Sequence, residues 1–284
     1  MVKILADSTC DLSVELLKKY DIDIIPLNVS MDETEVKDGP DTDIDAIFKW
    51  CDENNTTPHT SAPSFEAAMD VMKPFLDEGK ELVIFTISSE MSTSSNVMHI
   101  AAEELDAEDK VTVIDSRNLS TGIGLLVVEA AIMAKEGKTA GEIEEKILEL
   151  IPRVRASFVV DTLTYLYRGG RCNAVSALFG SALKLHPEIV VKDGKMDASK
   201  KYRGKMSKVI LDYANDLTDS MKKAVPSRAF VTHTPCDRET VDSVVEFVKS
   251  LNIFDEVLET QAGAVISSHC GPGTLGVLFI DSEE

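Results

Sequence analysis

The chain is poor in basic residues. Among its 284 residues, 29 are Lys or Arg and 49 are Asp or Glu, which gives a formal net charge of −20 at pH 7. A protein of that charge repels the phosphate backbone of nucleic acids and anionic lipid surfaces. We therefore expect neither nucleic acid nor a membrane surface as a partner.

The chain also lacks the cysteine and histidine patterns that hold metals. Its five cysteines are scattered and odd in number, and none forms a C-x-x-C pair, so neither a disulfide framework nor a zinc site is predicted. No pair of histidines has a spacing such as H-E-x-x-H. We expect no metal and no cofactor, and scattered thiols favour a reducing cytosol.

Long apolar runs are missing as well. The most apolar stretch, residues 125–134, is interrupted by Glu129 and is too short to span a bilayer. The N-terminus reaches Asp7 too early for a signal peptide. These features predict a cytoplasmic protein with no integral membrane segment.

The first half of the chain alternates strand-like and helix-like patterns, which is typical of a doubly wound, mainly parallel α/β sheet. At 284 residues the chain exceeds the usual ~100–200 residues of one domain, so we expect two domains. The predicted strands are 3–6, 22–29, 82–87 and 111–115, the predicted helices are 13–20, 44–54, 92–105 and 122–136, and 32–43 is predicted to be a loop.

The second half has a different pattern. A capping box at Thr139 and Glu142 starts a helix that Pro152 ends, and we place the domain boundary there. Residues 1–152 are predicted to form an N-terminal α/β domain, and residues 153–284 a C-terminal α/β domain with a mixed or antiparallel sheet. Its predicted strands are 158–160, 189–191, 228–232, 256–260, 265–268 and 275–280, its predicted helices are 205–222 and 240–251, and 192–195 is a predicted hairpin turn.

Two hydroxyl-rich loops precede predicted helices in the first half. One is Thr60-Ser61-Ala62-Pro63-Ser64, and the other extends from Thr86 to Ser95 and contains Ser92. Free amides at a helix N-terminus favour an anion and hydroxyls add donors, so a carboxylate would fit there. The same residues also suit helix N-caps, and the sequence leaves both interpretations open. The chain has no G-x-S-x-G nucleophile elbow, which argues against that type of hydrolase.

Glycines accompany three further segments. The stretch 120–124 opens a helix but does not match G-x-G-x-x-G, so its two glycines indicate close helix–sheet packing. Residues 167–171, Tyr-Arg-Gly-Gly-Arg, are typical of a helix C-cap whose arginines lie at the domain interface or on the surface. The basic run 200–205 is either a solvated hairpin edge or a contact with a phosphate or a partner.

One histidine stands out near the C-terminus. His269 is followed by Cys270 and a Gly-Pro-Gly turn, and we expect it at the end of a strand with its ring held in one direction. A structural role and a binding role both fit this position.

Taken in order, these segments resemble the DegV family, the bacterial fatty-acid-binding proteins that include the lipid-binding subunit of fatty acid kinase. The resemblance extends from one end of the chain to the other. Six motifs carry it: Asp7-Ser8-Thr9-Cys10-Asp11-Leu12, Thr60-Ser61-x-Pro63, Ser88-Ser89-x-x-Ser92, Val113-Ile114-Asp115-Ser116, Gly169-Gly170-Arg171 and His269-x-Gly271-Pro272-Gly273.

The resemblance implies that one long-chain fatty acid lies in an apolar tunnel between the two domains and that the chain alone performs no covalent chemistry. Family members present the acid to a separate ATP-dependent fatty acid kinase, so contacts with the kinase or acyl-phosphate are implied for Arg203 and Arg171. No cofactor is implied beyond the bound acid. The residues implied to hold its carboxylate are Thr60, Ser61, Ser92, Thr93 and His269.

The chain departs from the family at one of these positions. The family continues the serine with Gly-Thr, whereas Ser92 is followed here by Thr93 and Ser94. The β-carbon of Thr93 narrows the approach of a headgroup to the backbone. Four methionines near the two loops either line the tunnel or fill the core. They are Met69, Met72, Met91 and Met98.

Two other classes of function stay open. A small-molecule phosphotransfer domain like that of dihydroxyacetone kinase would need a nucleotide site or a histidine bonded to substrate, and no Walker-type loop or Mg²⁺ carboxylate cluster is recognised at the strand ends. A serine hydrolase would use Ser92 as nucleophile and His269 as base.

Overall fold

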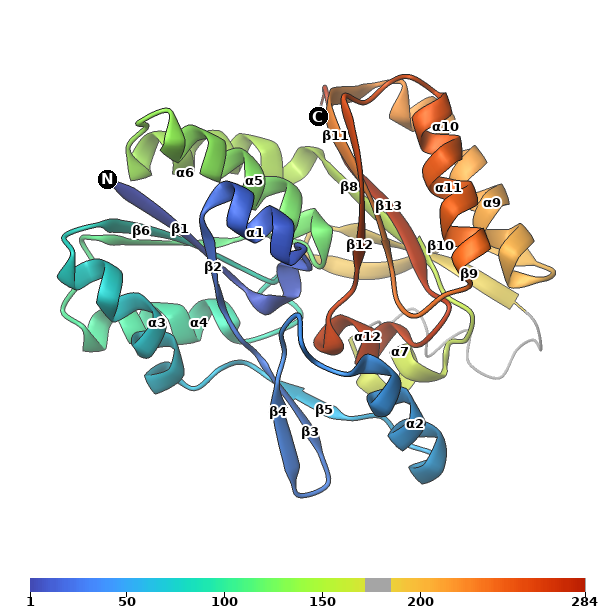
Figure 1. The fold of residues 1–284 in the computed structure, drawn as a ribbon, viewed down its shortest axis with the longest axis horizontal. Helices are drawn as coiled ribbons and strands as arrows, with labels where there is room; N and C mark the ends of the chain where they lie inside the picture. The colour runs from blue at the N-terminus through green and yellow to red at the C-terminus, as the bar shows by residue number, and fades with distance from the viewer. Residues whose placement is uncertain (172–184, 284) are drawn as a thin grey trace.

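The computed structural model describes residues 1–171 and 185–283, and the chain folds there around three β-sheets (Figure 1). The first is a four-stranded, fully parallel sheet in the order β2-β1-β6-β7. Its strands are β1 (Val2–Asp7), β2 (Ile22–Ile25), β6 (Glu81–Thr86) and β7 (Val111–Asp115). This sheet confirms the parallel α/β prediction for the first half.

Helices cover both faces of the parallel sheet. On one face α3 (Phe65–Asp77) and α4 (Ser94–Glu104) pack against Leu82 and Ile84. On the other face α5 (Thr121–Lys135) and α6 (Ala140–Leu150) pack against Val83 and Phe85, with α1 (Val14–Tyr20) beside α5. Because successive strand residues point to opposite buried faces, these strands read as continuous apolar runs.

The order of the parallel strands creates a switch point. From β1 the chain continues outward to β2, whereas from β6 it continues outward in the other direction to β7. The carboxyl ends of β1 and β6 therefore lie side by side, and ligands in such sheets bind outside this point. The loop after β1 contains the short helix η1 (Ser8–Cys10), and the loop after β6 contains Ser92.

The second sheet has six strands in the order β10-β9-β8-β13-β11-β12. All pairings are antiparallel except that of β11 with β12, so the predicted mixed sheet is confirmed. The helices α9 (Met206–Asp216), α10 (Thr218–Met221) and α11 (Arg238–Ser250) pack on one face. The strands are β8 (Val154–Val159), β9 (Leu185–Lys192), β10 (Lys195–Arg203), β11 (Ala224–His233), β12 (Glu256–Gln261) and β13 (Leu275–Asp281).

A third, small sheet corrects two sequence predictions. Segment 22–29 is not one strand, because Pro26 lacks an amide hydrogen and the chain turns there from β2 into β3 (Asn28–Met31). Segment 32–43 is not only a loop, since it contains β4 (Thr34–Lys37), which pairs with β3. The third strand is β5 (His59–Ser61), which the sequence prediction lacks. Helix α2 (Ile44–Asn54), which was predicted, lies between β4 and β5 in the chain.

The predicted strand at 265–268 is also wrong. These residues form the helix α12 (Ala264–Cys270), in which six of the seven residues are buried. A helix buried on all sides shows no 3.6-residue alternation, so its apolar run cannot be told from a strand by pattern. The predicted helix 205–222 is divided at Leu217 into α9 and α10.

Several local predictions are confirmed. Thr139 and Glu142 form the capping box of α6, and η2 (Ile151–Arg153) follows this helix. The two central residues of the β9–β10 turn, Asp193 and Gly194, have φ values of 50° and 81°. A type I′ turn requires a positive φ at both of these positions. Helix α7 (Thr164–Gly169) ends on Gly170 in the left-handed conformation.

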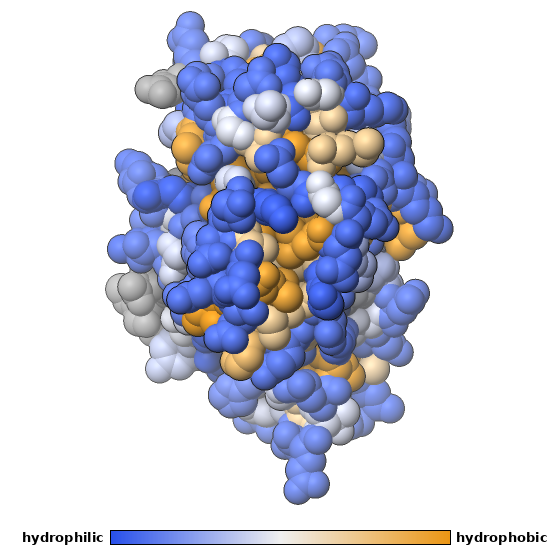
Figure 2. All heavy atoms as spheres, turned by 90° about the vertical axis from the view of Figure 1, so that its left-hand side faces the viewer, coloured by the Kyte–Doolittle hydropathy of each residue, from blue (hydrophilic) through white to orange (hydrophobic). Residues whose placement is uncertain are grey.

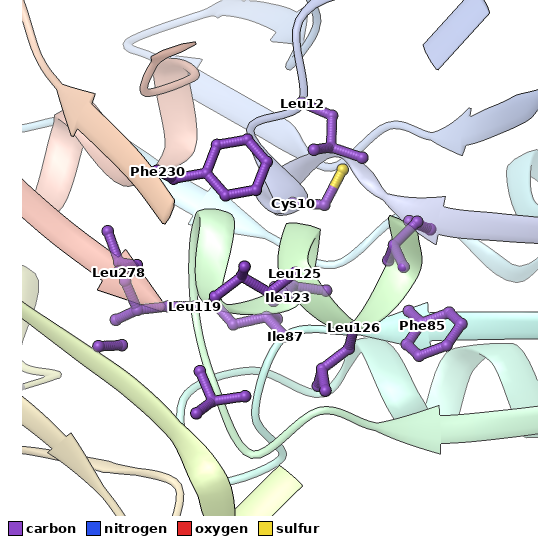
Figure 3. Close-up of a cluster of buried hydrophobic side chains, with 14 of the residues drawn as sticks. Cys10, Leu12, Phe85, Ile87, Leu119, Ile123, Leu125, Leu126, Phe230 and Leu278 are labelled. Carbon is purple, nitrogen blue, oxygen red and sulfur yellow. The ribbon is translucent and has the colours of Figure 1, made fainter. Parts of the chain in front are cut away.

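The two halves share a core. Helix α5 packs against β1 on one side and against β8 and β13 on the other. Figure 3 shows Phe85 and Leu126 in the same cluster as Phe230 and Leu278 of the six-stranded sheet. The parallel sheet ends before Pro152 and the six-stranded sheet begins after it, while a domain boundary at Pro152 stays a prediction.

The outer surface is largely polar. Hydrophilic side chains cover most of the face seen in Figure 2, with apolar atoms visible between them. Within residues 1–171 and 185–283, no helix combines the length and the apolar character needed to cross a bilayer.

Candidate functional site

A cavity of about 430 Å³ contains most of the predicted site residues. Its volume falls within the ~300–1,000 Å³ that is usual for small-molecule sites. Both halves of the chain contribute to its wall. The lining residues are Leu27, Thr60, Ser61, Ala62, Ile87, Ser89, Met91, Ser92, Thr93, Leu119, Arg171, Met196, Val265, Ile266, His269 and Cys270.

Ser92 and Thr93 reach the cavity from the loop at the switch point. The hydroxyl of Ser92 accepts from the amide of Ser94 at 3.2 Å and lies 3.0 Å from the Ser94 hydroxyl. Thr93 is the N-cap residue of α4, but its side chain makes no capping bond. Its φ of −89° is ordinary for a threonine, so the departure from the family glycine strains no backbone.

Thr60 and His269 meet across the cavity wall. Thr60 lies on β5, where it pairs with Val29 of β3, and His269 is in the last turn of α12. The Oγ1 of Thr60 is 2.8 Å from the Nε2 of His269. Ser61 is the exposed last residue of β5 and also lines the cavity.

The other nitrogen of His269 is packed without a partner. Its Nδ1 is buried and makes no hydrogen bond with any described residue. A β-carbon on Gly169 would lie only 2.2 Å from this Nδ1, so the ring can occupy its position only because residue 169 is glycine. Burial and the charge of Arg171 lower the pKa of His269 to about 4, so the imidazole is neutral at pH 7.

Arg171 gives the cavity its charge. Its Nη1 donates to the Gly169 carbonyl at 2.8 Å and its Nε to the Met91 carbonyl at 3.5 Å. It is the only charged side chain among the described residues that line the cavity. Arg168 does not line the cavity, and its Nη2 donates to Oδ1 of Asn55 in the first half at 2.8 Å. Both arginines thus connect the two halves, which agrees with the interface interpretation.

Apolar side chains form the rest of the wall and continue inward. A second, smaller cavity of about 30 Å³ shares Leu119, Ile266 and Cys270 with the first. Phe158 and Leu278 line it from the six-stranded sheet. The two cavities therefore adjoin.

The tip of the β9–β10 hairpin closes one side of the site. The Ser88 hydroxyl donates to the Gly194 carbonyl at 2.7 Å, and Arg117 donates to the Asp193 carbonyl at 2.9 Å. Met196, two residues after Gly194 on β10, lines the cavity. The hairpin of the second half thus holds the loop of the first half that carries Ser92.

Some predicted residues lie elsewhere. Arg203 does not line the cavity, because it is at the opposite end of β10 from Met196, roughly 20 Å away at ~3.3 Å per residue. Ser64 is the N-cap of α3 and accepts from the Ala67 amide at 3.2 Å. Of the four methionines near the loops only Met91 lines the cavity, since Met72 and Met98 are in the core.

A larger groove of about 990 Å³ lies elsewhere between the two halves. It is lined by charged residues of both signs, including Arg117, Glu144, Arg155 and Glu188, and by none of the residues predicted to bind a carboxylate. Its size alone therefore does not make it the functional site.

The geometry disfavours the hydrolase alternative. Within the described part of the chain, the ring of His269 is bonded to Thr60 and not to Ser92. Its Nδ1 has no carboxylate to orient it, as the base of a catalytic triad would need. Likewise, no group of three or more His, Cys, Asp or Glu residues suited to a metal ion occurs in the described ranges.

Sequence reasoning missed part of the wall. Leu27, Leu119 and Met196 are single apolar residues whose positions depend on packing, and no local signal identifies them. The position of Arg171 beside His269 could have been anticipated, because both belong to glycine-containing turns at predicted element ends.

Comparisons with known proteins agree with this architecture. A family model described as "Uncharacterised protein, DegV family" matches residues 1–282. A DegV domain-containing protein from Clostridium acetobutylicum is 32% identical over 284 residues, covering 99% of this chain and 98% of the relative.

Solved structures show the same fold. One, presented as "Fatty Acid Binding of a DegV family Protein from Thermus thermophilus", has a TM-score of 0.89 and 28% identity, with 99% of each chain covered. A stearic-acid-binding protein from Eubacterium ventriosum has a TM-score of 0.84 and 30% identity, with 99% of this chain and 98% of that chain covered. The chain belongs to the DegV family.

Proposed function

We propose that the protein binds one long-chain fatty acid, with the carboxylate at the polar end of the 430 Å³ cavity and the tail along its apolar wall. The observation that carries this proposal is the chemistry of the lining. The lining combines hydroxyls, one imidazole and one guanidinium with apolar side chains, and no acidic side chain of the described residues lines the cavity. In a chain of net charge −20, such a site favours an anionic amphiphile.

The headgroup needs several donors, because a buried carboxylate without partners is costly. Thr60, Ser61, Ser92 and Thr93 supply them in this proposal, and His269 takes part through its hydrogen bond to Thr60. With Nδ1 of His269 buried and unpartnered, a proton on Nε2 avoids burying an unpaired N–H. Nε2–H then donates to the Thr60 hydroxyl, which is free to donate its own proton to the carboxylate.

Arg171 balances the charge in this proposal. Its guanidinium is fixed by two backbone carbonyls and is close enough to His269 to lower the pKa of the imidazole. A bound carboxylate beside it would pair with the guanidinium, which forms no ion pair with any other described residue. Arg171 therefore serves the headgroup directly, and any contact with a kinase would involve the same side chain.

The tail provides the driving force. At ~0.8 kcal/mol per buried methylene, a 16-carbon chain offers on the order of 10 kcal/mol before ordering costs. Its path leads past Leu119, Ile266 and Cys270 into the smaller cavity between α5, α12 and the six-stranded sheet. The relatives from Thermus thermophilus and Eubacterium ventriosum, presented as fatty-acid-binding proteins, support this choice of ligand.

The wider role is also part of the proposal. We infer that the chain divides near Pro152 into two domains, acts in the cytoplasm, and presents its fatty acid to a separate ATP-dependent kinase without catalysing a reaction itself. Arg203 supports this role because it is an exposed residue of the edge strand β10, away from the cavity. A surface position of this kind is available to a partner protein or to an acyl-phosphate in transit.

Native mass spectrometry tests the binding proposal. The purified protein is expected to carry the mass of a 14- to 18-carbon fatty acid, which denaturing extraction releases and identifies. After delipidation, added palmitate should raise the melting temperature. An unliganded mass together with no response to palmitate or oleate would refute the proposal.

A matched pair of arginines sharpens the test. Arg171→Gln should weaken palmitate binding by about tenfold, the loss expected from one charge-assisted hydrogen bond. Arg168→Gln removes an equal charge three residues earlier in the sequence, outside the cavity, and should leave binding unchanged. A fluorophosphonate probe should not label Ser92, whereas labelling would favour the hydrolase alternative.

A further inference from the structure

Two buried carboxylates hold the N-terminus of α12. The amide of Gly263 donates to Oδ1 of Asp11 at 2.8 Å, and the amide of Ala264 donates to Oδ1 of Asp38 at 2.7 Å. Asp11 follows η1 at the switch point and Asp38 follows β4, so both belong to the first half of the chain. The helix that they hold belongs to the second half.

The second oxygen of each carboxylate is fixed as well. The hydroxyl of Ser120 donates to Oδ2 of Asp11 at 2.5 Å, and the hydroxyl of Ser8 donates to Oδ2 of Asp38 at 2.8 Å. Each carboxylate therefore bridges a hydroxyl of the first half and an amide of α12. We call Asp11 and Asp38 the carboxylate pair.

Gly263 is the point where the pair converges. A β-carbon there would lie 2.9 Å from Oδ1 of Asp38 and 3.1 Å from Oδ1 of Asp11. Its φ of −66° suits any residue, so glycine is needed here for space and not for conformation. The same distances place the two carboxylate oxygens within about 6 Å of each other.

The pair is costly for stability. Asp11 and Asp38 are both almost fully buried, and burial raises the pKa of each above its ordinary value. In the described residues neither makes an ion pair or hydrogen bond with Lys, Arg or His. Neutral caps such as Asn or Ser would satisfy the same amides without burying charge. Because burying these two carboxylates lowers the stability of the fold, we look for their role in the groups that they position.

What the pair positions is one wall of the cavity. Val265, Ile266, His269 and Cys270 of α12 all line it, and His269 is only five residues beyond the amide that Asp38 holds. The helix has seven residues, so a shift at its first turn is transmitted to its last. The bond of 2.8 Å between His269 and Thr60 depends on that placement.

We propose that Asp11 and Asp38 are positioning residues that anchor α12 to the first half and thereby set the imidazole of His269 against Thr60 in the headgroup site. This inference rests on the proposed function, because its effect is on headgroup recognition. Neither carboxylate lines the cavity itself, so neither touches the ligand.

A double-mutant cycle tests the proposal. Asp38→Ala and His269→Ala are compared singly and together for affinity toward palmitate and toward methyl palmitate, which lacks the anionic headgroup. Asp38→Ala should weaken palmitate binding by about tenfold, the cost of one misplaced headgroup hydrogen bond, and methyl palmitate by less than about twofold. The double variant should bind palmitate no more weakly than His269→Ala alone. Additive losses, or equal losses for both ligands, would overturn the proposal.

Control variants separate positioning from general stability. Asp237→Ala removes the N-cap of α11, which accepts from the amide and hydroxyl of Thr240, and should leave palmitate affinity unchanged. Asp38→Asn keeps an acceptor for the Ala264 amide and should restore most of the affinity. If Asp38→Ala does not fold, Ser8→Ala decides, because it leaves both carboxylates in place and frees Oδ2 of Asp38. It also removes the acceptor of the Leu27 amide, and because Leu27 lines the apolar wall, that change affects palmitate and methyl palmitate alike. We then expect the affinity for palmitate to fall about two- to threefold more than the affinity for methyl palmitate. An unchanged affinity for palmitate would refute the proposal.

A ligand-free readout keeps the two proposals distinguishable. The ring proton resonance of His269 in the delipidated protein should shift in Asp38→Ala and not in Asp237→Ala. If the wild-type protein fails to bind palmitate, the proposed function fails, while this resonance still reports whether the carboxylate pair positions the ring. An unshifted resonance in Asp38→Ala overturns the positioning role.

Discussion

Replacing Gly169 with alanine tests how closely the headgroup histidine is packed. The new methyl group would lie 2.2 Å from Nδ1 of His269 and 3.0 Å from its Cε1. Non-bonded carbon and nitrogen atoms need about 3.5 Å, so the ring must move by roughly 1 Å. A displacement of that size exceeds the margin between the 2.8 Å distance to Thr60 and the 3.5 Å limit of a hydrogen bond, so the geometry of this bond is disrupted.

The expected effect is on recognition and not on folding. In the proposed site, Thr60 then loses the partner that orients its hydroxyl toward the carboxylate. Loss of that hydrogen bond to a charged group costs about 1.5 kcal/mol, or roughly tenfold in affinity for palmitate. Gly169 ends α7 without a positive φ, so the better helix propensity of alanine, up to about 1 kcal/mol, offsets part of the steric cost. The melting temperature should therefore change little.

The neighbouring glycine provides the opposite control. Gly170 has a φ of 66° with nothing within 4 Å of a built β-carbon. Gly170→Ala should cost about 1 kcal/mol of stability through left-handed strain and should leave palmitate affinity unchanged. Isothermal titration with palmitate and thermal unfolding of both variants give the comparison. Palmitate affinity of Gly169→Ala equal to that of the wild type would refute the argument for close packing.

Three further predictions concern the hydroxyl, the basic edge and the pH dependence. Ser92→Ala should weaken palmitate binding by about tenfold, whereas Ser64→Ala should cost about 1 kcal/mol of stability through the lost N-cap and spare binding, as titration and urea unfolding would show. The Arg203→Ala variant should bind palmitate normally but should support slower turnover by a fatty acid kinase. An equal loss of palmitate affinity and of turnover would contradict the assignment of Arg203 to the kinase contact. The folded-state pKa of His269, about 4, lies below its ordinary 6.5, so as the pH falls through this window the unfolded chain takes up the proton first and stability is lost. Between pH 7 and pH 4.5 the unliganded wild type should therefore lose about 2 kcal/mol more than His269→Gln in urea unfolding, and identical pH profiles would contradict the burial of a neutral ring.

Elements with a clear local pattern were predictable. The bounds of α2 and β7 match the sequence prediction, because an amphipathic helix and a buried parallel strand have distinct periodicities. The capping box at Thr139 is likewise a local signal. The five residues predicted to hold the headgroup were identified through the family resemblance, and all five line one cavity in the structure.

Features that depend on distant residues were not predictable. Residues 265–268 have the pattern of a strand because α12 is buried on all sides, and the carboxylates that hold its N-terminus, Asp11 and Asp38, lie more than 220 residues away in the sequence. The position of Met196 in the cavity depends on how the β9–β10 hairpin docks against Ser88. No short window of sequence contains such information, because the contacts exist only after packing.

The bond between Thr60 and His269 joins residues separated by 209 positions, and it has a consequence for the protein during synthesis. Contacts of such long sequence separation form late, since chain entropy opposes them until most of the structure is in place. A chain still on the ribosome, with its last segments unmade, therefore has no headgroup site. Under the proposed function, fatty acid capture is in this way restricted to molecules in which α12 has been made and packed.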